Sequence, residues 1–281
     1  MTAAPAARTP RPARPQVVLE VLATERLSPH MVRLTLGGEG FAGFQNKDAT
    51  DKYVKILFAD PALGLEPPYD LEALRVKLGP EAVPVRRTYT VRRVDEAART
   101  LQIDFVVHGD EGIAGPWAAA AQPGEKVCFN GPGGMYAPDP SADWHLLAGD
   151  ESALPAISVA LEALLDDAVG VAYLEVAGPE DELELAAPAG VELRWLHRGE
   201  FTPDSTVLAA AVEAGAWREG RVQVFAHGER EVVKNLRRYL AEERAVDRRQ
   251  LSLSAYWAYG RAEDAFQAEK REAVGQIFPE G

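Results

Sequence analysis

The chain has 281 residues, of which 47% are hydrophobic and 26% are charged, and this balance is typical of globular proteins that bury a sizeable core. Its 43 aspartates and glutamates outnumber 30 lysines and arginines, so the formal charge is −13. Such acidity argues against binding to nucleic acid and against docking on an anionic membrane, because both need a cationic surface.

The chain contains few cysteines and histidines, the residues that form disulfides and zinc sites. Cys128 is the single cysteine and cannot form an internal disulfide, a cysteine-based zinc site or an iron–sulfur cluster. None of the five histidines has the spacing of metal ligands, so we expect no metal site. Residues 1–15 lack the apolar stretch of a signal peptide, and no segment has the length of a transmembrane helix. We therefore expect a cytoplasmic protein with a flexible tail at residues 1–15.

The first half of the chain consists of short segments rich in β-branched residues. Strands are predicted at residues 16–28, 31–38, 52–60, 85–94, 100–109 and 126–134. A Pro/Gly-rich loop with a helical turn at 71–76 follows the third strand, and a helix-like segment at 115–121 follows the fifth. This pattern is typical of a six-stranded antiparallel barrel, which we assign to a domain at residues 16–140.

In the second half, strands alternate with helices. The predicted strands are 144–149, 169–178, 191–197, 221–228 and 251–260, and the predicted helices are 153–165, 205–215, 231–243 and 263–276. This alternation predicts a doubly wound parallel α/β domain at residues 141–281. Residues 161–220 hold thirteen acidic and only three basic side chains, so anionic ligands should prefer other parts of the molecule. The alternative is an ordinary solvated face.

Three segments carry residues suited to binding a nucleotide. Arg87 and Tyr89 project to one face of a strand, where a guanidinium and an aromatic ring suit a ligand with a phosphate and a planar ring system. A glycine-bearing turn at 108–118 precedes a short helix, and the turn at 149–157 stands where a dinucleotide loop would. A second turn of that kind holds Gly228 and Glu229. A G-x-G-x-x-G fingerprint is absent, and each segment alone is equally compatible with a plain strand pair or turn.

Taken in register, these motifs are similar to those of a known family. Arg-x-Tyr-Thr, His-Gly with Gly-x-Ala-x-x-Trp-Ala, Gly-Pro-x-Gly, Ala-Gly-Asp-Glu-Ser-Ala-Leu-Pro-Ala-Ile and Tyr-Trp-x-x-Gly follow one another between residues 17 and 261. Together they resemble the siderophore-interacting proteins, FAD-dependent ferric-siderophore reductases of the ferredoxin-reductase-like superfamily. The resemblance implies an FAD-binding barrel followed by an NAD(P)-binding α/β domain.

The resemblance also implies roles for particular residues. Arg87 would bind the FAD pyrophosphate, Tyr89 would pack on the isoalloxazine, and Thr90 would lie near its reactive edge. The cofactor-binding residues expected from the motifs and the resemblance are Arg87, Thr88, Tyr89, Thr90, His108, Gly112, Ala114, Gly115, Trp117, Asp150, Glu151, Ser152, Ala153, Gly228, Glu229, Tyr256 and Trp257. The chain departs from the family where Gly115 replaces a serine of the phosphate loop and Ala258 replaces an arginine after Tyr-Trp.

The activity implied is electron transfer from NADPH or NADH through FAD to a ferric siderophore, with no catalytic side chain required because flavin performs the redox chemistry. Basic residues should bind the anionic chelate: Lys55 foremost, then Lys52 and Arg86, with Arg92 and Arg93 nearby. The alternatives are a general flavin reductase with another acceptor, and a non-catalytic FAD- or siderophore-binding protein. We expect a monomer, with a ferredoxin as another conceivable electron donor.

The sequence leaves the choice between NADH and NADPH open. A basic helix face would suit a 2′-phosphate but is more often simply solvated. Its residues are Arg230, Lys234, Arg237 and Arg238.

Overall fold

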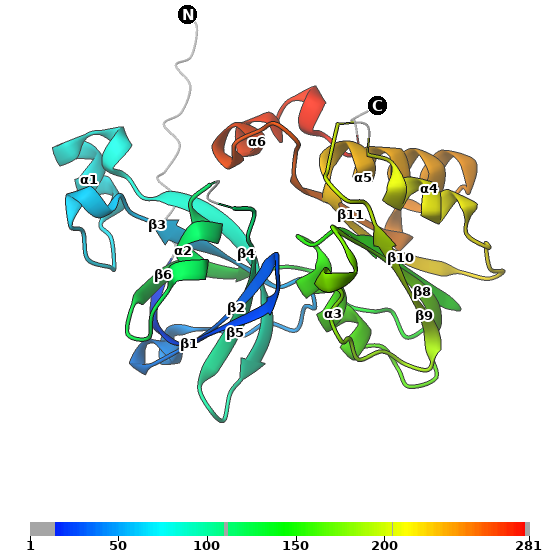
Figure 1. The fold of residues 1–281 in the computed structure, drawn as a ribbon, viewed down its shortest axis with the longest axis horizontal. Helices are drawn as coiled ribbons and strands as arrows, with labels where there is room; N and C mark the ends of the chain where they lie inside the picture. Colours follow the sequence, from blue (N-terminus) through cyan, green and yellow to red (C-terminus); the bar gives the residue numbers. More distant parts are fainter. Residues whose placement is uncertain (1–14, 110–111, 204, 279–281) are drawn as a thin grey trace, which may run out of the picture.

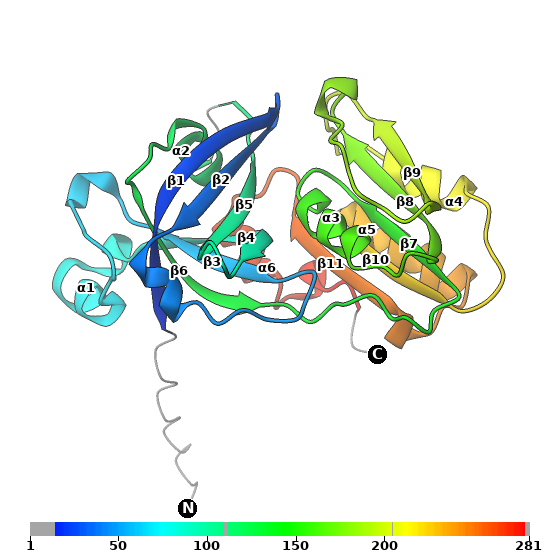
Figure 2. The ribbon, with the colours of Figure 1, turned by 90° about the horizontal axis from the view of Figure 1, so that it is seen from below.

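The structure is a computed structural model that describes residues 15–109, 112–203 and 205–278. Two parts lie side by side: an antiparallel barrel formed by the first half of the chain, and a parallel sheet with helices formed by the second half (Figures 1 and 2). The predicted fold class is confirmed. The predicted tail at residues 1–15 lies, apart from Pro15, outside the described residues.

The barrel is closed by six antiparallel strands in the order β1-β2-β5-β4-β3-β6. The strands are β1 (Gln16–Ser28), β2 (Met31–Gly37), β3 (Tyr53–Phe58), β4 (Val85–Asp95), β5 (Thr100–Val106) and β6 (Lys126–Gly133). Alternate residues Val17, Leu19 and Val21 of β1 are buried, because successive side chains of a strand point to opposite faces. Two short helices interrupt the barrel sequence: α1 (Leu71–Leu78) before β4 and α2 (Ala114–Ala120) before β6.

The second half forms a five-stranded parallel sheet in the order β11-β10-β7-β8-β9. The strands are β7 (Trp144–Gly149), β8 (Val169–Val176), β9 (Gly190–His197), β10 (Val222–Glu229) and β11 (Leu251–Trp257). The chain runs outward from β7 to β9 and then returns to β10 on the other side of β7. The carboxyl ends of β7 and β10 therefore form the switch point, where open α/β sheets bind ligands.

Helices cover both faces of this sheet. On one face, Ile157 of α3 (Leu154–Glu162) shares a core with Met31 and Tyr136 from the barrel half of the chain. The opposite face is covered by α4 (Val207–Ala214) and α5 (Arg230–Arg237), whose Leu208 and Leu236 belong to a second core. The shared apolar core around α3 therefore connects the barrel to the sheet.

Two polar contacts reinforce this connection. Arg92 of β4 pairs with Glu162 at the end of α3, with 3.0 Å between Nη1 and Oε2. At the turn between β1 and β2, Nδ1 of His30 lies 2.7 Å from Oδ2 of Asp181, a residue that follows β8. Asp181 also accepts a hydrogen bond from the Ser28 hydroxyl at 2.8 Å. Because Asp181 is buried, these bonds satisfy a carboxylate that would otherwise be costly inside the protein.

The last predicted helix, residues 263–276, is shorter in the structure. Helix α6 spans Glu263–Glu269, and the chain then folds back through a short 3₁₀ turn at Ala273–Gly275. A Cβ atom at Gly275 would lie 2.1 Å from the carbonyl oxygen of Glu269, so this return needs a glycine. In the described part of the chain, no helix combines the length and apolar character needed to cross a membrane.

Candidate functional site

Strand β4 presents Arg87 and Tyr89 on one face, as the alternation of side chains predicts. The Tyr89 ring packs on Phe105 of β5, with ring centroids 4.3 Å apart. Burial is the main cause that raises the pKa of Tyr89, so its hydroxyl stays protonated at neutral pH. Tyr89 thus offers a fixed, neutral aromatic ring near the surface of the barrel.

Arg87 faces a carboxylate from the far end of the chain. Its Nη1 and Nη2 lie 3.3 and 3.4 Å from the two carboxylate oxygens of Asp264 in α6. Figure 1 shows that α6 (orange-red) reaches over toward the barrel, apart from the other helices of the second half. The Arg87 side chain is only 15% exposed, and its guanidinium is oriented by a further bond from Nη1 to the Arg86 carbonyl oxygen. This arrangement is suited to holding an anionic group in the paired geometry that guanidinium favours.

The turn after β5 brings Gly115 close to the barrel backbone. Gly112 has a φ of 78°, a conformation that favours glycine. A Cβ at Gly115 would lie 2.9 Å from the carbonyl oxygen of Val106, so the serine expected at this position would need the backbone to shift. Ala114 is buried beside it. The departure from the family pattern at Gly115 therefore has a steric reason in this chain.

The aromatic residues near this turn have other neighbours. Trp117 of α2 packs edge-on against Phe58 and Phe105, at centroid distances of 5.3 and 5.8 Å. Phe105 thus contacts both the Trp117 ring and the Tyr89 ring. The His108 ring lies 6.0 Å from the ring of His30, beside the contact between the barrel and the sheet.

At the carboxyl end of β7, Asp150 connects several elements. Its Oδ2 accepts hydrogen bonds from the Glu229 amide at 2.9 Å and from the Trp257 indole Nε1 at 2.8 Å. Its Oδ1 accepts from the amide of Ser152 at 2.9 Å and from the hydroxyl of the same residue. Ala153 is buried at the start of α3. The carboxylate thus joins the ends of β7, β10 and β11 in one network.

The close approach of Asp150 to β10 depends on Gly228. A Cβ at Gly228 would lie 2.6 Å from Oδ2 of Asp150. The next residue, Glu229, caps α5: its carboxylate accepts from the amides of Glu231 and Val232, and its other oxygen accepts from the Tyr259 amide. The predicted pair Gly228–Glu229 is therefore engaged in holding the switch point together.

Glu151 forms a buried ion pair that the sequence did not suggest. Its Oε2 lies 2.7 Å from Nη1 of Arg198, the residue that follows β9, and the same guanidinium nitrogen lies 3.8 Å from Oε1 of Glu175 in β8. Burial is the main cause that raises the pKa of Glu151, opposed by Arg198. Burial and the nearby Asp150 raise the pKa of Glu175 to about 7. The only hint in the sequence is an arginine directly after a strand within an acidic region.

Strand β11 carries Tyr256 and Trp257 to the junction between the two halves. The Tyr256 ring lies 5.0 Å from the ring of His227, and burial is the main cause that raises the pKa of Tyr256. The Tyr256 ring also packs on the core that contains Met31 and Tyr136 of the barrel half, and a hydrogen bond with Thr90 of β4 lowers the pKa of Tyr256. Thr90 is itself buried. The structure therefore brings together the β4 segment and the ends of β7, β10 and β11.

The predicted basic residues fall into different surroundings. Nζ of Lys55 lies 3.2 Å from the Thr88 hydroxyl, beside the Arg87 strand. Lys52 bonds Asn46, and burial lowers its pKa. Arg86 is exposed. Arg92, by contrast, is engaged with Glu162 at the contact between barrel and sheet.

Sequence reasoning missed a further lysine near Lys55. Lys270, directly after α6, has a pKa lowered mainly by burial and partly by the charge of Lys55. Its Nζ lies 4.6 Å from the Phe266 ring centroid. The C-terminal segment thus brings both a carboxylate, at Asp264, and a cation toward the barrel.

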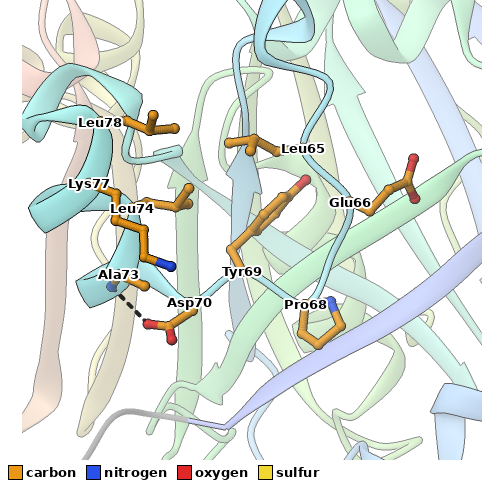
Figure 3. A pocket seen from close by; sticks show the side chains of 9 residues that line it. All are labelled: Leu65, Glu66, Pro68, Tyr69, Asp70, Ala73, Leu74, Lys77 and Leu78. Atoms are coloured by element: carbon orange, nitrogen blue, oxygen red, sulfur yellow. Dashed lines mark hydrogen bonds between the residues drawn. The ribbon is translucent and has the colours of Figure 1, made fainter.

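A cavity of about 240 Å³ opens elsewhere in the barrel half (Figure 3). It lies between α1 and the loop that precedes it. Leu65, Tyr69 and Lys77 are among its lining residues, and Asp70 at its edge caps α1 through the Ala73 amide. None of the predicted site residues lines this cavity, so it is separate from the arrangement around Arg87 and Asp150.

Both halves of the chain match the models of known protein families. The profile of the siderophore-interacting FAD-binding domain matches residues 20–136, and that of the siderophore-interacting protein matches residues 142–260. The barrel half is thus similar to domains that bind FAD, as the resemblance implied.

Curated relatives cover nearly the whole chain. An uncharacterized protein of Mycobacterium tuberculosis is 50% identical over 92% of this chain and 96% of its own length. The ferric vibriobactin reductase ViuB of Vibrio cholerae is 35% identical over 93% of this chain and 96% of its own. The NADPH-dependent ferric-chelate reductase of Escherichia coli is 33% identical, with coverage of 85% and 91%.

Solved structures show the same architecture. A siderophore utilization protein from T. fusca superposes with a TM-score of 0.77 at 39% identity, over 88% of this chain and 94% of that one. A ferredoxin reductase of carbazole 1,9a-dioxygenase shares the fold at a TM-score of 0.64 and 13% identity, over 88% and 71% of the two chains.

Proposed function

The chain belongs to the siderophore-interacting protein family, and on this basis we propose that it is an FAD-dependent ferric-siderophore reductase that takes electrons from NAD(P)H. The observation that carries the proposal is the junction at β11, where Tyr256 hydrogen-bonds Thr90 of the barrel and the next residue, Trp257, donates to Asp150 at the end of β7. A flavin held by β4 would there face the switch point of the sheet, where α/β sheets bind nucleotides. In this proposal the FAD-binding domain spans residues 16–140 and the NAD(P)-binding domain spans residues 141–281.

The residues of the barrel fit FAD. Nη1 and Nη2 of Arg87 each contact one carboxylate oxygen of Asp264. A diphosphate would bind to the same two nitrogens in place of this carboxylate. Tyr89 offers a rigid aromatic face of the kind on which planar rings stack. When bound, FAD supplies the conversion between two-electron and one-electron transfer that neither nicotinamide nor iron provides alone.

The protein's own residues would position the reactants rather than react. Asp150 fixes the Trp257 indole and the start of α5, so the sheet edge is rigid before the donor binds. The half-buried Tyr256 and the buried Thr90 would limit the access of bulk water to the junction between the two halves. Because the donor delivers hydride, no side chain needs to donate a proton, and the one proton released overall would pass to solvent.

The overall reaction balances without a further reactant. One NAD(P)H gives up a hydride, which is two electrons and a proton equivalent, and two ferric ions take one electron each. The products are NAD(P)⁺, one proton and two Fe²⁺. Because the hard oxygen donors of a siderophore hold Fe³⁺ more tightly than Fe²⁺, reduction favours release of the metal.

An anionic ferric chelate would be attracted by the cations beside β4. Lys55 is the main candidate because it lies against Thr88, next to Arg87, and Lys52 and Arg86 would contribute from its surroundings. The names of the V. cholerae and E. coli relatives support a ferric chelate as substrate and a nicotinamide as donor. Donation by a ferredoxin, the monomeric state and the cytoplasmic location stay predictions.

Purified protein loaded with FAD tests the proposal. NADH or NADPH should bleach the flavin absorbance under anaerobic conditions, and a ferric siderophore should restore it. Bleaching without recovery on adding ferric siderophore would favour a flavin reductase with another acceptor. Failure to bind FAD would contradict both functions.

A further inference from the structure

The carboxyl edge of the sheet carries an unusual concentration of buried acids. Asp150 and Glu151 follow β7, Glu175 lies at the end of β8, and Glu229 ends β10; each residue is at most 4% exposed. We refer to these four residues as the carboxylate cluster. Arg198, whose side chain is 5% exposed, is the guanidinium that faces Glu151 and Glu175. Four carboxyl groups therefore face a single guanidinium at the switch point, where a dinucleotide would bind.

Arg198 contacts the cluster through one guanidinium nitrogen, Nη1, and its buried Nε has no hydrogen-bond partner among the described residues. It is held between two carboxylates, at 2.7 Å from Glu151 and 3.8 Å from Glu175. Glu175 is itself anchored on the other side, where its Oε2 accepts from the Leu208 amide at the start of α4. Phe201 lies over the guanidinium, 5.6 Å from its central carbon, and packs edge-on against Trp257. A phosphate that bound to Nη1 would compete with the carboxylates of Glu151 and Glu175.

One acceptor in the cluster has no partner. Within the described residues, Oε1 of the buried Glu151 has no hydrogen-bond partner, although its other oxygen is bound to Arg198. A buried carboxylate oxygen without a donor is costly, and a ligand hydroxyl would relieve that cost. Ribose hydroxyls are donors, whereas a 2′-phosphate at neutral pH is an acceptor with a charge near −2.

Of the four other cations predicted for a 2′-phosphate, three form ion pairs, Arg237 with Glu242 among them, whereas the exposed Arg238 has no ion pair among the described residues. Arg230 pairs with Glu231 at 3.1 Å and also with Glu269. Lys234 pairs with Glu231 at 3.0 Å. These pairs neutralise the start of α5 before any ligand arrives.

We propose that the donor site selects NADH over NADPH, and that the unit formed by Glu151, Arg198 and Glu175 determines this specificity. The inference rests on the proposed function, since it concerns the donor of the same reaction. An unphosphorylated ribose presents a diol to the carboxylate cluster, while a 2′-phosphate meets repulsion that is little screened inside the protein. The chain would thus differ from its E. coli relative, which is named as NADPH-dependent.

The test compares both donors on FAD-loaded protein. The kcat/KM for anaerobic flavin reduction should be at least about tenfold higher with NADH than with NADPH, as expected for one added charge repulsion in a partly buried site. Calorimetry should likewise give tighter binding of 5′-AMP than of 2′,5′-ADP. This binding readout does not depend on reduction of iron.

Variants that remove one carboxylate test which residues cause the preference for NADH over NADPH. Glu151→Gln and Glu175→Gln keep the side-chain shape and release Arg198, so each should lower the NADH-to-NADPH ratio by about tenfold. Glu192→Gln is the matched control, because Glu192 is a more exposed acid of β9 paired with Arg194, and it should leave the ratio unchanged. If a variant fails to fold, the NADH-to-NADPH ratio of the wild type and its affinities for 5′-AMP and 2′,5′-ADP still test the proposed preference.

Two outcomes would overturn the inference. Equal or better use of NADPH by the wild type, while ferric siderophore still restores the flavin absorbance, would refute the specificity and leave the proposed function standing. Failure of both nucleotides to bleach the flavin would refute the inference together with the nicotinamide donor of the proposed function.

Discussion

The indole Nε1 of Trp257 donates a 2.8 Å hydrogen bond to Oδ2 of Asp150, and so the last strand of the sheet is joined to its first. The two residues are 107 positions apart in the chain. Strand β10 lies between their strands, and its Glu229 amide donates to the same oxygen. The order of the strands brings the carboxyl ends of β7, β10 and β11 to one edge, where a single carboxylate can connect them.

Removing the indole donor should weaken this edge. We expect Trp257→Phe to lower the free energy of unfolding by about 1–3 kcal/mol, because a buried charged acceptor loses one partner. Urea denaturation followed by circular dichroism measures this change. Tyr259→Phe, at a largely exposed position two residues later, is the control and should change stability by less than about 0.5 kcal/mol. An unchanged midpoint for Trp257→Phe would show that the bond contributes nothing.

Loss of the Arg87 guanidinium should weaken FAD binding. A charge-assisted bond of this kind is worth about 1.5–3 kcal/mol, so we expect Arg87→Ala to raise the FAD dissociation constant about 10- to 100-fold. Quenching of flavin fluorescence gives the constant. Arg93→Ala, an exposed arginine of the same strand, should leave it unchanged. Equal affinities of Arg87→Ala and wild type would place the diphosphate elsewhere.

Tyr89 should act through its ring rather than its hydroxyl. We expect Tyr89→Ala to lower FAD retention during gel filtration, whereas Tyr89→Phe should retain FAD like the wild type. The reason is that the ring provides the stacking face, held in place against Phe105. Equal loss in both variants would assign the effect to the hydroxyl instead.

Asp264 should compete with the cofactor for Arg87. Its carboxylate occupies the guanidinium in this structure and would repel a diphosphate placed there. We therefore expect Asp264→Asn to tighten FAD binding severalfold, measured in the same titration. Asp247→Asn, which removes an acid paired with Arg249 away from the barrel, is the control. Weaker FAD binding in Asp264→Asn would mean that α6 supports the cofactor rather than competing with it.

The free energy of unfolding should change with pH because the Glu175 carboxyl group titrates with a raised pKa. Because burial raises its pKa from 4.5 to about 7, the folded state binds this proton more tightly than the unfolded state does. The contribution of Glu175 to stability is therefore full below about pH 4.5 and is lost as the pH rises through about 7. The loss amounts to roughly 3 kcal/mol at most, because each tenfold difference in proton affinity between the two states corresponds to about 1.4 kcal/mol.

Glu175→Gln removes this titration while keeping an acceptor for the Leu208 amide. Its free energy of unfolding relative to wild type should rise between pH 5 and pH 8, measured by denaturant titration at each pH. The exposed Glu219→Gln serves as control. A constant difference across this range would mean that Glu175 titrates with an ordinary pKa.

Much of the architecture was predictable because it depends on local patterns. The period-two alternation of Val17, Leu19 and Val21 predicts a half-buried strand, and the strand–helix alternation after residue 141 predicts the parallel sheet. Asp150 and Glu151 were expected at the cofactor site because they stand directly after a strand and before a helix. Their partners were not predictable in the same way.

The missed contacts join residues far apart in the chain. Arg198 meets Glu151 at a separation of 47 residues, and Asp264 meets Arg87 at 177. Neither pairing has a periodic or local signal, since it depends on which strands are neighbours and on where the C-terminal segment returns to the barrel. The early end of α6 was missed for a similar reason: Gly275 packs on the backbone of Glu269, a tertiary contact.

The central claim is that electrons pass from a nicotinamide through bound FAD to a ferric siderophore. Anaerobic stopped-flow mixing of FAD-loaded, NADH-reduced protein with a ferric siderophore, in the presence of a chromophoric Fe²⁺ chelator, tests it most directly. We predict that flavin absorbance returns as two Fe²⁺ appear per reduced flavin, since each ferric ion accepts one electron. Flavin that stays reduced while no Fe²⁺ forms would contradict this claim.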